Sequence, residues 1–341
     1  MGSEVTLKHI AEALGISAMT VSRALNNRDN VDEKTRQRVL EKAQSMGYTP
    51  NHVAKSLVSS KTYTIGVVIP EITHAFFPEV VRGIEEVTNS SSYQLFLTNA
   101  NEKFEQEKKA IKALRSKRVD GILISSSLTV EDYSFYKQLI QSDTEIVFFD
   151  RCVENIGASC VSVNDKISAR QITEHLITEH GFTKLAYLSG PQHVSVGRER
   201  YQGFLDAMNK HDIPLVDKWI IEGGFQEKAG YKAMKQILDL PRDEFPEAII
   251  NVNDPSAIGA IQAINEEGLS IPDDFAIVGF TDDIRANLLK VPLTTVHQPA
   301  YEVGKRAARK LLDSIENEDE PTENIELLTT LKIRASCGCN S

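Results

Sequence analysis

Two pairs of polar side chains could do chemistry in this chain of 341 residues, and each pair follows a short apolar run. They are Asn253-Asp254 and Asp282-Asp283. Carboxylates at strand ends can act as catalytic acids, but they more often accept hydrogen bonds from the hydroxyls of a polar ligand. The sequence has no G-x-G-x-x-G after a strand, no phosphate-binding loop, no G-x-S-x-G elbow and no metal-spaced set of His and Glu. We therefore predict a ligand-binding protein that is not an enzyme and needs no cofactor.

The four cysteines form no recognisable metal or redox motif. Cys152, Cys160, Cys337 and Cys339 include no C-x-x-C pair, and no histidine cluster accompanies them. Cys337-Gly-Cys339 could in principle be a redox or metal pair. Two reduced thiols in the tail of a cytosolic protein are the simpler interpretation.

Three short amphipathic helices are predicted within residues 6–47. Thr6 and Ser17 can cap the first and second helices, and Gly15 suits the end of the first. The third is expected from about Asp32 to Gly47. Its apolar stripe comprises Val39, Leu40, Ala43 and Met46. This spacing is typical of the helix-turn-helix, whose second helix enters the major groove of DNA. The alternative is a small helical domain with no role in DNA binding.

The length of the chain exceeds what one core usually fills and predicts two or three domains. The net charge is −10, yet residues 1–60 hold eight basic and six acidic side chains, which leaves −12 for the remainder. DNA affinity is then expected to rely on hydroxyls and helix N-termini as well as on cations. The longest apolar runs are too short to span a bilayer and no signal peptide is recognisable, so cytoplasm is the expected location.

Past residue 60, strand-length runs rich in β-branched residues alternate with helical stretches. This order predicts an α/β fold with doubly wound, mostly parallel sheets in two lobes of similar size. Strands are expected at 65–69, 94–98, 121–125, 146–149, 184–188, 248–252 and 276–279. Helices are expected at 78–87, 104–117, 131–141, 169–179, 200–210, 228–238 and 256–266. The acidic stretch 316–326 is expected to be a solvated connection.

The motifs TLKHIAEALGIS, TVSRALN, YTPN and VAKSL resemble, without a gap over the first 60 residues, the headpiece of the lactose-repressor (LacI/GalR) family of bacterial transcription regulators. IGVVIPEITHAFFPEVVRGIEEV, HLITEHGFTKLAYLSGP, IPDDFAIVGFTDD and VPLTTVHQP extend the resemblance to nearly the whole chain. It implies a headpiece at 1–60, with a hinge helix at about 50–60. It also implies a periplasmic-binding-protein-like effector and dimerisation core at 61–341. The first lobe would comprise about 61–163 and 294–324, and the second about 164–293 and 325–341.

By this resemblance, the base-reading positions of the second helix fall on Ala18, Met19 and Arg23. Arg23 suits guanine, because a guanidinium can bond O6 and N7 together. Ala18 and Met19 could touch a thymine methyl, or Met19 is simply an exposed apolar residue. The positions placed against phosphate are Thr6, Ser17, Thr20, Ser22, Asn26 and Thr35. Asp32 stands where a phosphate-contacting serine is common, and we assign it as a helix cap only.

The segment Asn51–Ser59 matches the hinge of the family, which folds on DNA and pairs with its partner's hinge. Leu57 matches the leucine that wedges into the minor groove at the centre of the operator, and Ala54 matches the small residue that lets paired hinges approach. An apolar wedge unstacks one base step and kinks the duplex. The alternative is that Leu57 packs on the first lobe.

The resemblance also carries effector positions onto this chain. Arg200 matches the arginine that clamps effector oxygens, and the alternative for it is a surface ion pair with a helix carboxylate. The other candidates are Phe76, Ser125, Asn164, Asp165, Asn253, Asp254, Thr281 and Asp282. Thr281 stands where many members have an aspartate, which leaves the ligand class open. A sugar or sugar derivative is favoured, and a nucleobase or nucleoside comes second.

Together these features predict a sequence-specific transcription regulator, a repressor, that binds a palindromic operator under allosteric control by a small molecule. Paired hinge helices and a palindromic operator require a dimer, and the chain lacks the C-terminal leucine heptads of the tetrameric family members, so a homodimer is expected. No membrane partner is expected. The alternative is a sugar-binding sensory module whose headpiece is not a specific reader of DNA. The sequence identifies neither the operator nor the effector, nor whether the effector releases DNA or promotes its binding.

Overall fold

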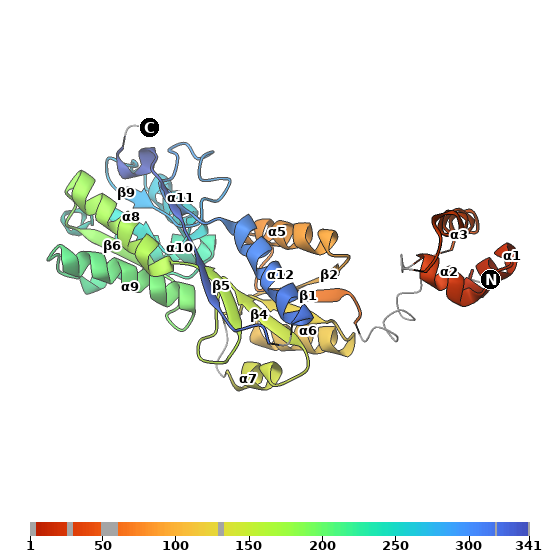
Figure 1. The fold of residues 1–341 in the computed structure, drawn as a ribbon. Helices are drawn as coiled ribbons and strands as arrows, with labels where there is room; N and C mark the ends of the chain where they lie inside the picture. The colour runs from red at the N-terminus through yellow and green to blue at the C-terminus, as the bar shows by residue number, and fades with distance from the viewer. Residues whose placement is uncertain (1–4, 26–29, 49–60, 129–132, 318, 340–341) are drawn as a thin grey trace. The chain divides into compact units, whose positions relative to one another are not determined.

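The computed structural model describes residues 5–25, 30–48, 61–128, 133–317 and 319–339. The chain forms two compact units, Met1–Thr62 and Tyr63–Ser341 (Figure 1). The predicted hinge at about 50–60 lies outside the described residues. Among the described helices, none is both long enough and apolar enough to cross a membrane.

The N-terminal unit consists of α1 (Leu7–Leu14), α2 (Ala18–Leu25) and α3 (Glu33–Ser45). Gly15 ends α1 in the left-handed conformation, with φ at 66°. Ser17 Oγ accepts a hydrogen bond of 3.1 Å from the backbone N–H of Thr20, and Asp32 Oδ1 accepts one of 3.0 Å from that of Thr35. These bonds satisfy N–H groups that the first turn of a helix leaves without partners, and they confirm the predicted caps at Ser17 and Asp32.

The core of this unit is made by small and β-branched side chains from all three helices. Its buried members are Ile10, Ala11, Val21, Ala24, Val39 and Ala43. Leu40 is 48% exposed, so its assignment to the apolar stripe of α3 is wrong. It directly follows the buried Val39, and one residue turns a helix by about 100°, which carries the leucine off the buried face.

The first lobe of the larger unit is built on a six-stranded sheet in the order β11-β5-β4-β3-β1-β2, in which every pair is parallel. The strands are β1 (Thr64–Ile69), β2 (Gln94–Asn99), β3 (Gly121–Ile124), β4 (Glu145–Phe149), β5 (Ser159–Val163) and β11 (Asn324–Leu327). Side chains alternate between its two faces, so Val67 and Ile69 pack in one apolar cluster and Val68 in another.

Helices cover both faces of this sheet, as the doubly wound pattern requires. They are α5 (Phe76–Ser90), α6 (Phe104–Ser116), α7 (Ser134–Ile140) and α12 (Ala300–Glu316). The helices α5 and α12 lie side by side on one face (Figure 1). Gly83 and Gly304 make this contact possible, because a Cβ on Gly83 would lie 2.0 Å from Tyr301 O and one on Gly304 would lie 1.9 Å from Val80 O.

The second lobe has a parallel sheet in the order β7-β6-β8-β9, again with helices on both faces. The strands are β6 (Leu185–Ser189), β7 (Ile220–Glu222), β8 (Ala248–Asn251) and β9 (Ala276–Val278). The α-helices are α8 (Asp165–His180), α9 (Ser195–Lys210), α10 (Glu227–Leu238) and α11 (Asp254–Glu266), and the 3₁₀ turns are η1 (Asp217–Trp219), η2 (Arg242–Glu244) and η3 (Ala335–Cys337). Two doubly wound parallel sheets confirm the predicted fold class.

The chain passes between the lobes three times. It leaves the first lobe from β5 into α8, returns through β10 (Thr295–His297) to α12, and crosses again from β11 to β12 (Thr330–Lys332). The strands β10 and β12 pair with each other, antiparallel. The acidic stretch 316–326 is not only a solvated connection, because β11 begins within it and the buried Lys310 Nζ donates to Glu320 Oε1 at 2.7 Å. In the first lobe, a disulfide joins Cys152 and Cys160.

Candidate functional site

The exposed face of α2 presents two of the three predicted base-reading positions, Met19 and Arg23. Val21 and Ala24 are buried, whereas Met19 is 64% exposed and Arg23 is also exposed. Met19 and Arg23 are four residues apart and so lie on the same side of the helix. An apolar side chain beside a guanidinium is a surface that can contact a thymine methyl and a guanine edge.

Four of the six predicted phosphate positions, Thr6, Ser17, Thr20 and Thr35, lie at or near the N-termini of helices. Thr6 is the N-cap residue of α1, and Ser17 precedes α2, with its Oγ 2.9 Å from that of Thr20. The hydrogen bonds of Thr35 lower the pKa of Asp32, so its carboxylate holds its charge as a cap on α3. Ala18 and Ser22 are half-buried on α2. Asn26, Asn51, Ala54 and Leu57 lie outside the described residues.

In the larger unit, a pocket with about 480 Å³ of empty volume, its solvent mouth included, receives side chains from both lobes. The first lobe contributes His74, Ala75, Phe76 and Phe77 around the start of α5, and Asp150 and Arg151 directly after β4. The second lobe contributes Val196, Arg200, Phe225, Asn253, Pro255, Thr281 and Asp283, and Gln298 follows β10. Most of these residues follow the carboxyl ends of parallel strands, which is where ligands bind in folds of this kind.

Arg200 projects from α9 to this pocket and is held by three contacts. Its Nε donates to Asp165 Oδ1 at 2.7 Å, and its Nη1 donates to the carbonyl of Val252 at 2.7 Å. Its guanidinium lies 3.8 Å from the centre of the Phe280 ring. Burial raises the pKa of Asp165, and the charge of Arg200 opposes that rise. The partner is a helix carboxylate, but the ion pair is buried and is not the surface pair considered as the alternative.

Arg151 lines the pocket from the first lobe, and its charge is also paired with a carboxylate. Two of its nitrogens donate to the two carboxylate oxygens of Glu102, at 2.8 and 3.0 Å. The guanidinium lies 4.9 Å from the centre of the Phe225 ring of the second lobe. Burial raises the pKa of the adjacent Asp150 to about 6, against the attraction of Arg151. Sequence reasoning missed Asp150 and Arg151, although their position directly after the EIVFF strand was a usable signal.

Gln298 was also missed, and it carries a distinctive feature. Its side chain is only 4% exposed, and its Nε2 has no hydrogen-bond partner within the described part of the chain. A buried amide N–H without an acceptor is costly, and such a group normally finds a partner in a ligand or in water. A donor in this state on the pocket wall points to an oxygen-bearing ligand.

Of the nine predicted effector residues, four line the pocket: Phe76, Arg200, Asn253 and Thr281. The other five, Ser125, Asn164, Asp165, Asp254 and Asp282, do not. Ser125 is fully buried, and Asn164 caps α8 and donates to Glu326 at 2.7 Å. Asp165 supports the pocket through Arg200.

Asp254 and Asp282 form a polar support behind the wall of the pocket. Asp254 Oδ1 accepts from Thr295 Oγ1 at 2.6 Å, and its Oδ2 accepts from Asp283 N at 2.7 Å. Burial is the largest effect on the carboxyl of Asp254 and raises its pKa to about 7. Asp282 accepts from Arg334 at 2.6 Å. Both carboxylates hold the segment that carries Thr281 in place.

A helix-turn-helix unit joined to two parallel α/β lobes that enclose a small-molecule pocket defines a class of protein, the ligand-responsive DNA-binding regulators. Residues 6–51 match the family model described as bacterial regulatory proteins, lacI family, and residues 173–337 match the one described as a periplasmic binding protein-like domain. The chain belongs to the LacI family and is a DNA-binding regulator of transcription, as predicted.

Similar proteins span the whole length of the chain. The HTH-type transcriptional repressor PurR of Mannheimia succiniciproducens is 33% identical over 97% of this chain and 98% of its own. The ribose operon repressor of Halalkalibacterium halodurans is also 33% identical, over 96% of each chain. These relatives are regulators, which supports the prediction that the chain is not an enzyme.

Two solved structures resemble this chain over nearly all of its length. A crystal structure of the lac repressor dimer bound to operator and an anti-inducer has a TM-score of 0.87 and 25% identity, and covers 98% of this chain and 99% of its own. The complex of the transcriptional regulator CelR with cellobiose has a TM-score of 0.74 and 27% identity, and covers 98% of this chain and 100% of its own.

Proposed function

We propose that this regulator represses transcription in the cytoplasm by binding a palindromic operator as a homodimer, and that a neutral polyhydroxy ligand, a sugar or an uncharged sugar derivative, controls this binding from the pocket. The observation that carries the ligand class is the unpartnered Nε2 of Gln298 on a pocket wall whose two arginines are already paired.

The pairing of Arg151 and Arg200 argues against an anionic ligand. Each guanidinium already holds a carboxylate, and Asp150 adds negative charge to the lining, whereas the charge of Asp283 is paired with Arg285. A phosphate or a sugar acid would enter against this charge. The ring of Phe76 offers an apolar face among the polar groups, and such a mixed lining suits the alternating C–H and O–H faces of a sugar ring. A purine remains the second candidate, because aromatic faces also stack on bases.

An exposed edge strand of the first lobe is our candidate for the dimer interface. The strand β2 is an edge of the six-stranded sheet, and Phe96 and Leu97 on it are 43% and 38% exposed. An exposed apolar edge strand favours association with another chain. A dimer would bring two headpieces to two half-sites. We propose that Ala18, Met19 and Arg23 contact bases there. Phosphate contacts are proposed for Thr6, Ser17, Thr20, Ser22, Asn26 and Thr35, and hinge contacts for Asn51, Ala54 and Leu57.

A ligand can control DNA binding because the residues that line the pocket come from both lobes. Because Asp150 and Arg151 belong to the first lobe and Arg200 and Asn253 to the second, a ligand that contacts both sets favours one relative position of the lobes. It changes DNA affinity only as far as it binds the DNA-competent arrangement and the other arrangement with different affinities. A ligand that prefers the DNA-competent arrangement promotes DNA binding, and a ligand that prefers the other arrangement releases DNA.

The experiment is a thermal-shift screen of the full chain with three sets of probes: neutral mono- and disaccharides, sugar phosphates, and purines. We expect stabilisation only from members of the first set. The hits are then titrated into the Gln298→Ala variant and into Gln202→Ala, a matched change on the exposed side of α9. Gln298→Ala should weaken binding by about tenfold, since one hydrogen bond to a buried group is lost, and Gln202→Ala should not. Stabilisation by sugar phosphates or purines alone would overturn the neutral-sugar assignment.

A further inference from the structure

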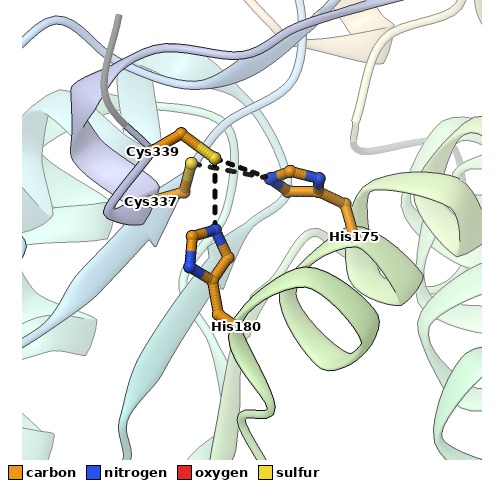
Figure 2. Close-up of side chains that lie close together, drawn as sticks. All are labelled: His175, His180, Cys337 and Cys339. Atoms are coloured by element: carbon orange, nitrogen blue, oxygen red, sulfur yellow. Dashed lines mark hydrogen bonds between the residues drawn. The ribbon is translucent and has the colours of Figure 1, made fainter.

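Two cysteines and two histidines come together at the end of α8 that is remote from the pocket. His175 and His180 lie in the last turns of α8, and Cys337 and Cys339 lie in and after η3 near the C-terminus. Figure 2 shows the two sulfur atoms and the two imidazole rings directed toward a common point. The expectation that no histidines accompany the tail cysteines is thus wrong. The sequence did not show this cluster, because about 160 residues separate the histidines from the cysteines that they meet in space.

The distances between these atoms fit the edges of a metal-centred tetrahedron. Nε2 of His175 lies 3.6 Å from Cys337 Sγ and 3.7 Å from Cys339 Sγ, and Nε2 of His180 lies 3.4 Å from Cys339 Sγ. All four ligand atoms lie within 4.8 Å of one another. Zinc bonds of about 2.3 Å to sulfur and about 2.0–2.1 Å to nitrogen, at tetrahedral angles, place sulfur and nitrogen about 3.5 Å apart. The observed separations agree with that edge.

The backbone holds this arrangement from both sides. Gly338, between the two cysteines, has φ at 99°, a left-handed conformation that turns the chain so that both sulfurs face the helix. Ser336 anchors the tail, since its Oγ donates to the carbonyl of Ile277 at 2.6 Å. On the helix side, the ring of His180 stacks on that of Phe182 at 5.3 Å between centroids. The ligands are thus positioned by packing that does not depend on an ion.

Of the two cysteines, Cys337 is the more deeply buried. Cys337 is fully buried, and its Sγ accepts a hydrogen bond of 3.1 Å from Thr294 Oγ1, so it is held in place beside the histidines. A thiolate is the form that binds metal. The cluster contains no carboxylate, and two thiolates with two imidazoles in tetrahedral positions favour zinc over magnesium or calcium.

We propose that His175, His180, Cys337 and Cys339 form a tetrahedral site for one zinc ion that ties the C-terminal segment to α8. With four protein ligands no position stays open for a substrate, so the site is structural. Ten residues of helix, about 15 Å, separate Asp165 beside the pocket from His175, so it is distinct from the effector site.

The metal has a definite structural consequence. The tail that it fastens follows β12, the third crossing between the lobes, and Arg334 on this segment donates to Asp282 beside the pocket wall. An ion that binds only the folded state raises the free energy of unfolding, and the gain grows as the free ion concentration rises above the dissociation constant. Zinc should accordingly raise the thermal midpoint of the larger unit, and a strong chelator should lower it.

The test uses the full chain without a polyhistidine tag, purified without chelator, and its metal content measured by mass spectrometry. We expect about one zinc ion per chain. The metal-free protein is then titrated with Co²⁺, which should give the intense visible bands of a tetrahedral ion and a thiolate-to-cobalt charge-transfer band. His180→Gln and Cys339→Ser, which change the less buried ligands, should each weaken cobalt binding at least tenfold, the lower end of the roughly 10–100-fold that even outer-shell changes cost. His211→Gln, a matched change on the same lobe, should bind like the unchanged chain.

A tetrahedral cobalt spectrum that His180→Gln and Cys339→Ser abolish would establish the site even if the purified protein holds little zinc. A protein with neither bound zinc nor a thiolate-to-cobalt band would overturn the proposal. So would a weak, octahedral cobalt spectrum, or variants that bind cobalt as tightly as the unchanged chain.

Discussion

Replacing Arg200 by methionine should destabilise the larger unit strongly, because it leaves the carboxylate of Asp165 buried without its counter-charge. Both side chains are less than a tenth exposed, and methionine keeps most of the volume. Removing one partner of a buried ion pair costs about 3–5 kcal/mol, and the contact with the Phe280 ring is lost as well. A domain of ordinary stability, about 5–15 kcal/mol, would remain folded but close to its limit.

The assay is urea unfolding followed by circular dichroism, with Arg200→Met compared with Arg200→Met/Asp165→Asn. The double variant should recover about half of the loss or more, since no buried charge is left unpaired. The loss in Arg200→Met should also be smaller at pH 5 than at pH 7.5. Burial raises the pKa of Asp165, and without Arg200 it rises further, so at the lower pH the folded state holds the carboxyl protonated. A loss below about 1 kcal/mol, or one equal at both pH values, would refute the reasoning.

Three further changes test other parts of the molecule. Phe96→Glu on the edge strand should convert the dimer to a monomer by analytical ultracentrifugation, because it buries a charge in the proposed interface; Leu215→Glu, an exposed leucine elsewhere, should not. Asp254 holds its proton in the folded state up to about pH 7 but releases it near its ordinary pKa when unfolded, so its contribution to stability falls as pH rises between about 4 and 7. Asp254→Asn should remove this decrease in the free energy of unfolding, which amounts to up to roughly 4 kcal/mol and is measured by urea unfolding. An equal dependence of that free energy on pH in both proteins would contradict the prediction. Arg23→Ala should cost about 1–3 kcal/mol in DNA-binding titrations and relax one base position, whereas Thr20→Ala should weaken all sequences alike; a uniform loss for Arg23→Ala would exclude base reading.

Local signals in the sequence predicted local structure well. The caps at Ser17 and Asp32 and the left-handed Gly15 depend on residues within three or four positions, and the structure has all three. The alternation of strands and helices likewise predicted both sheets. The strands β5, β7, β10, β11 and β12 were not predicted. Of these, β7, β10 and β12 have only three residues each, which are too few to show a period.

The site was predicted only in part, because its side chains are directed by contacts distant in sequence. Asp254 faces Thr295, 41 residues away, and so turns from the pocket that its neighbour Asn253 lines. Arg151 is held by Glu102, 49 residues earlier. The separation of Cys337 from His175 is larger still, and no spacing rule could have joined them.

The most direct test of the account is selection of DNA from a random pool by the purified full chain at roughly physiological salt, followed by sequencing of the bound sites. We expect a palindrome with two half-sites about one helical turn apart and a flexible step at its centre, with enrichment that changes when the stabilising sugar is added. No enriched palindrome, either with or without that sugar, would contradict a ligand-controlled, operator-specific regulator.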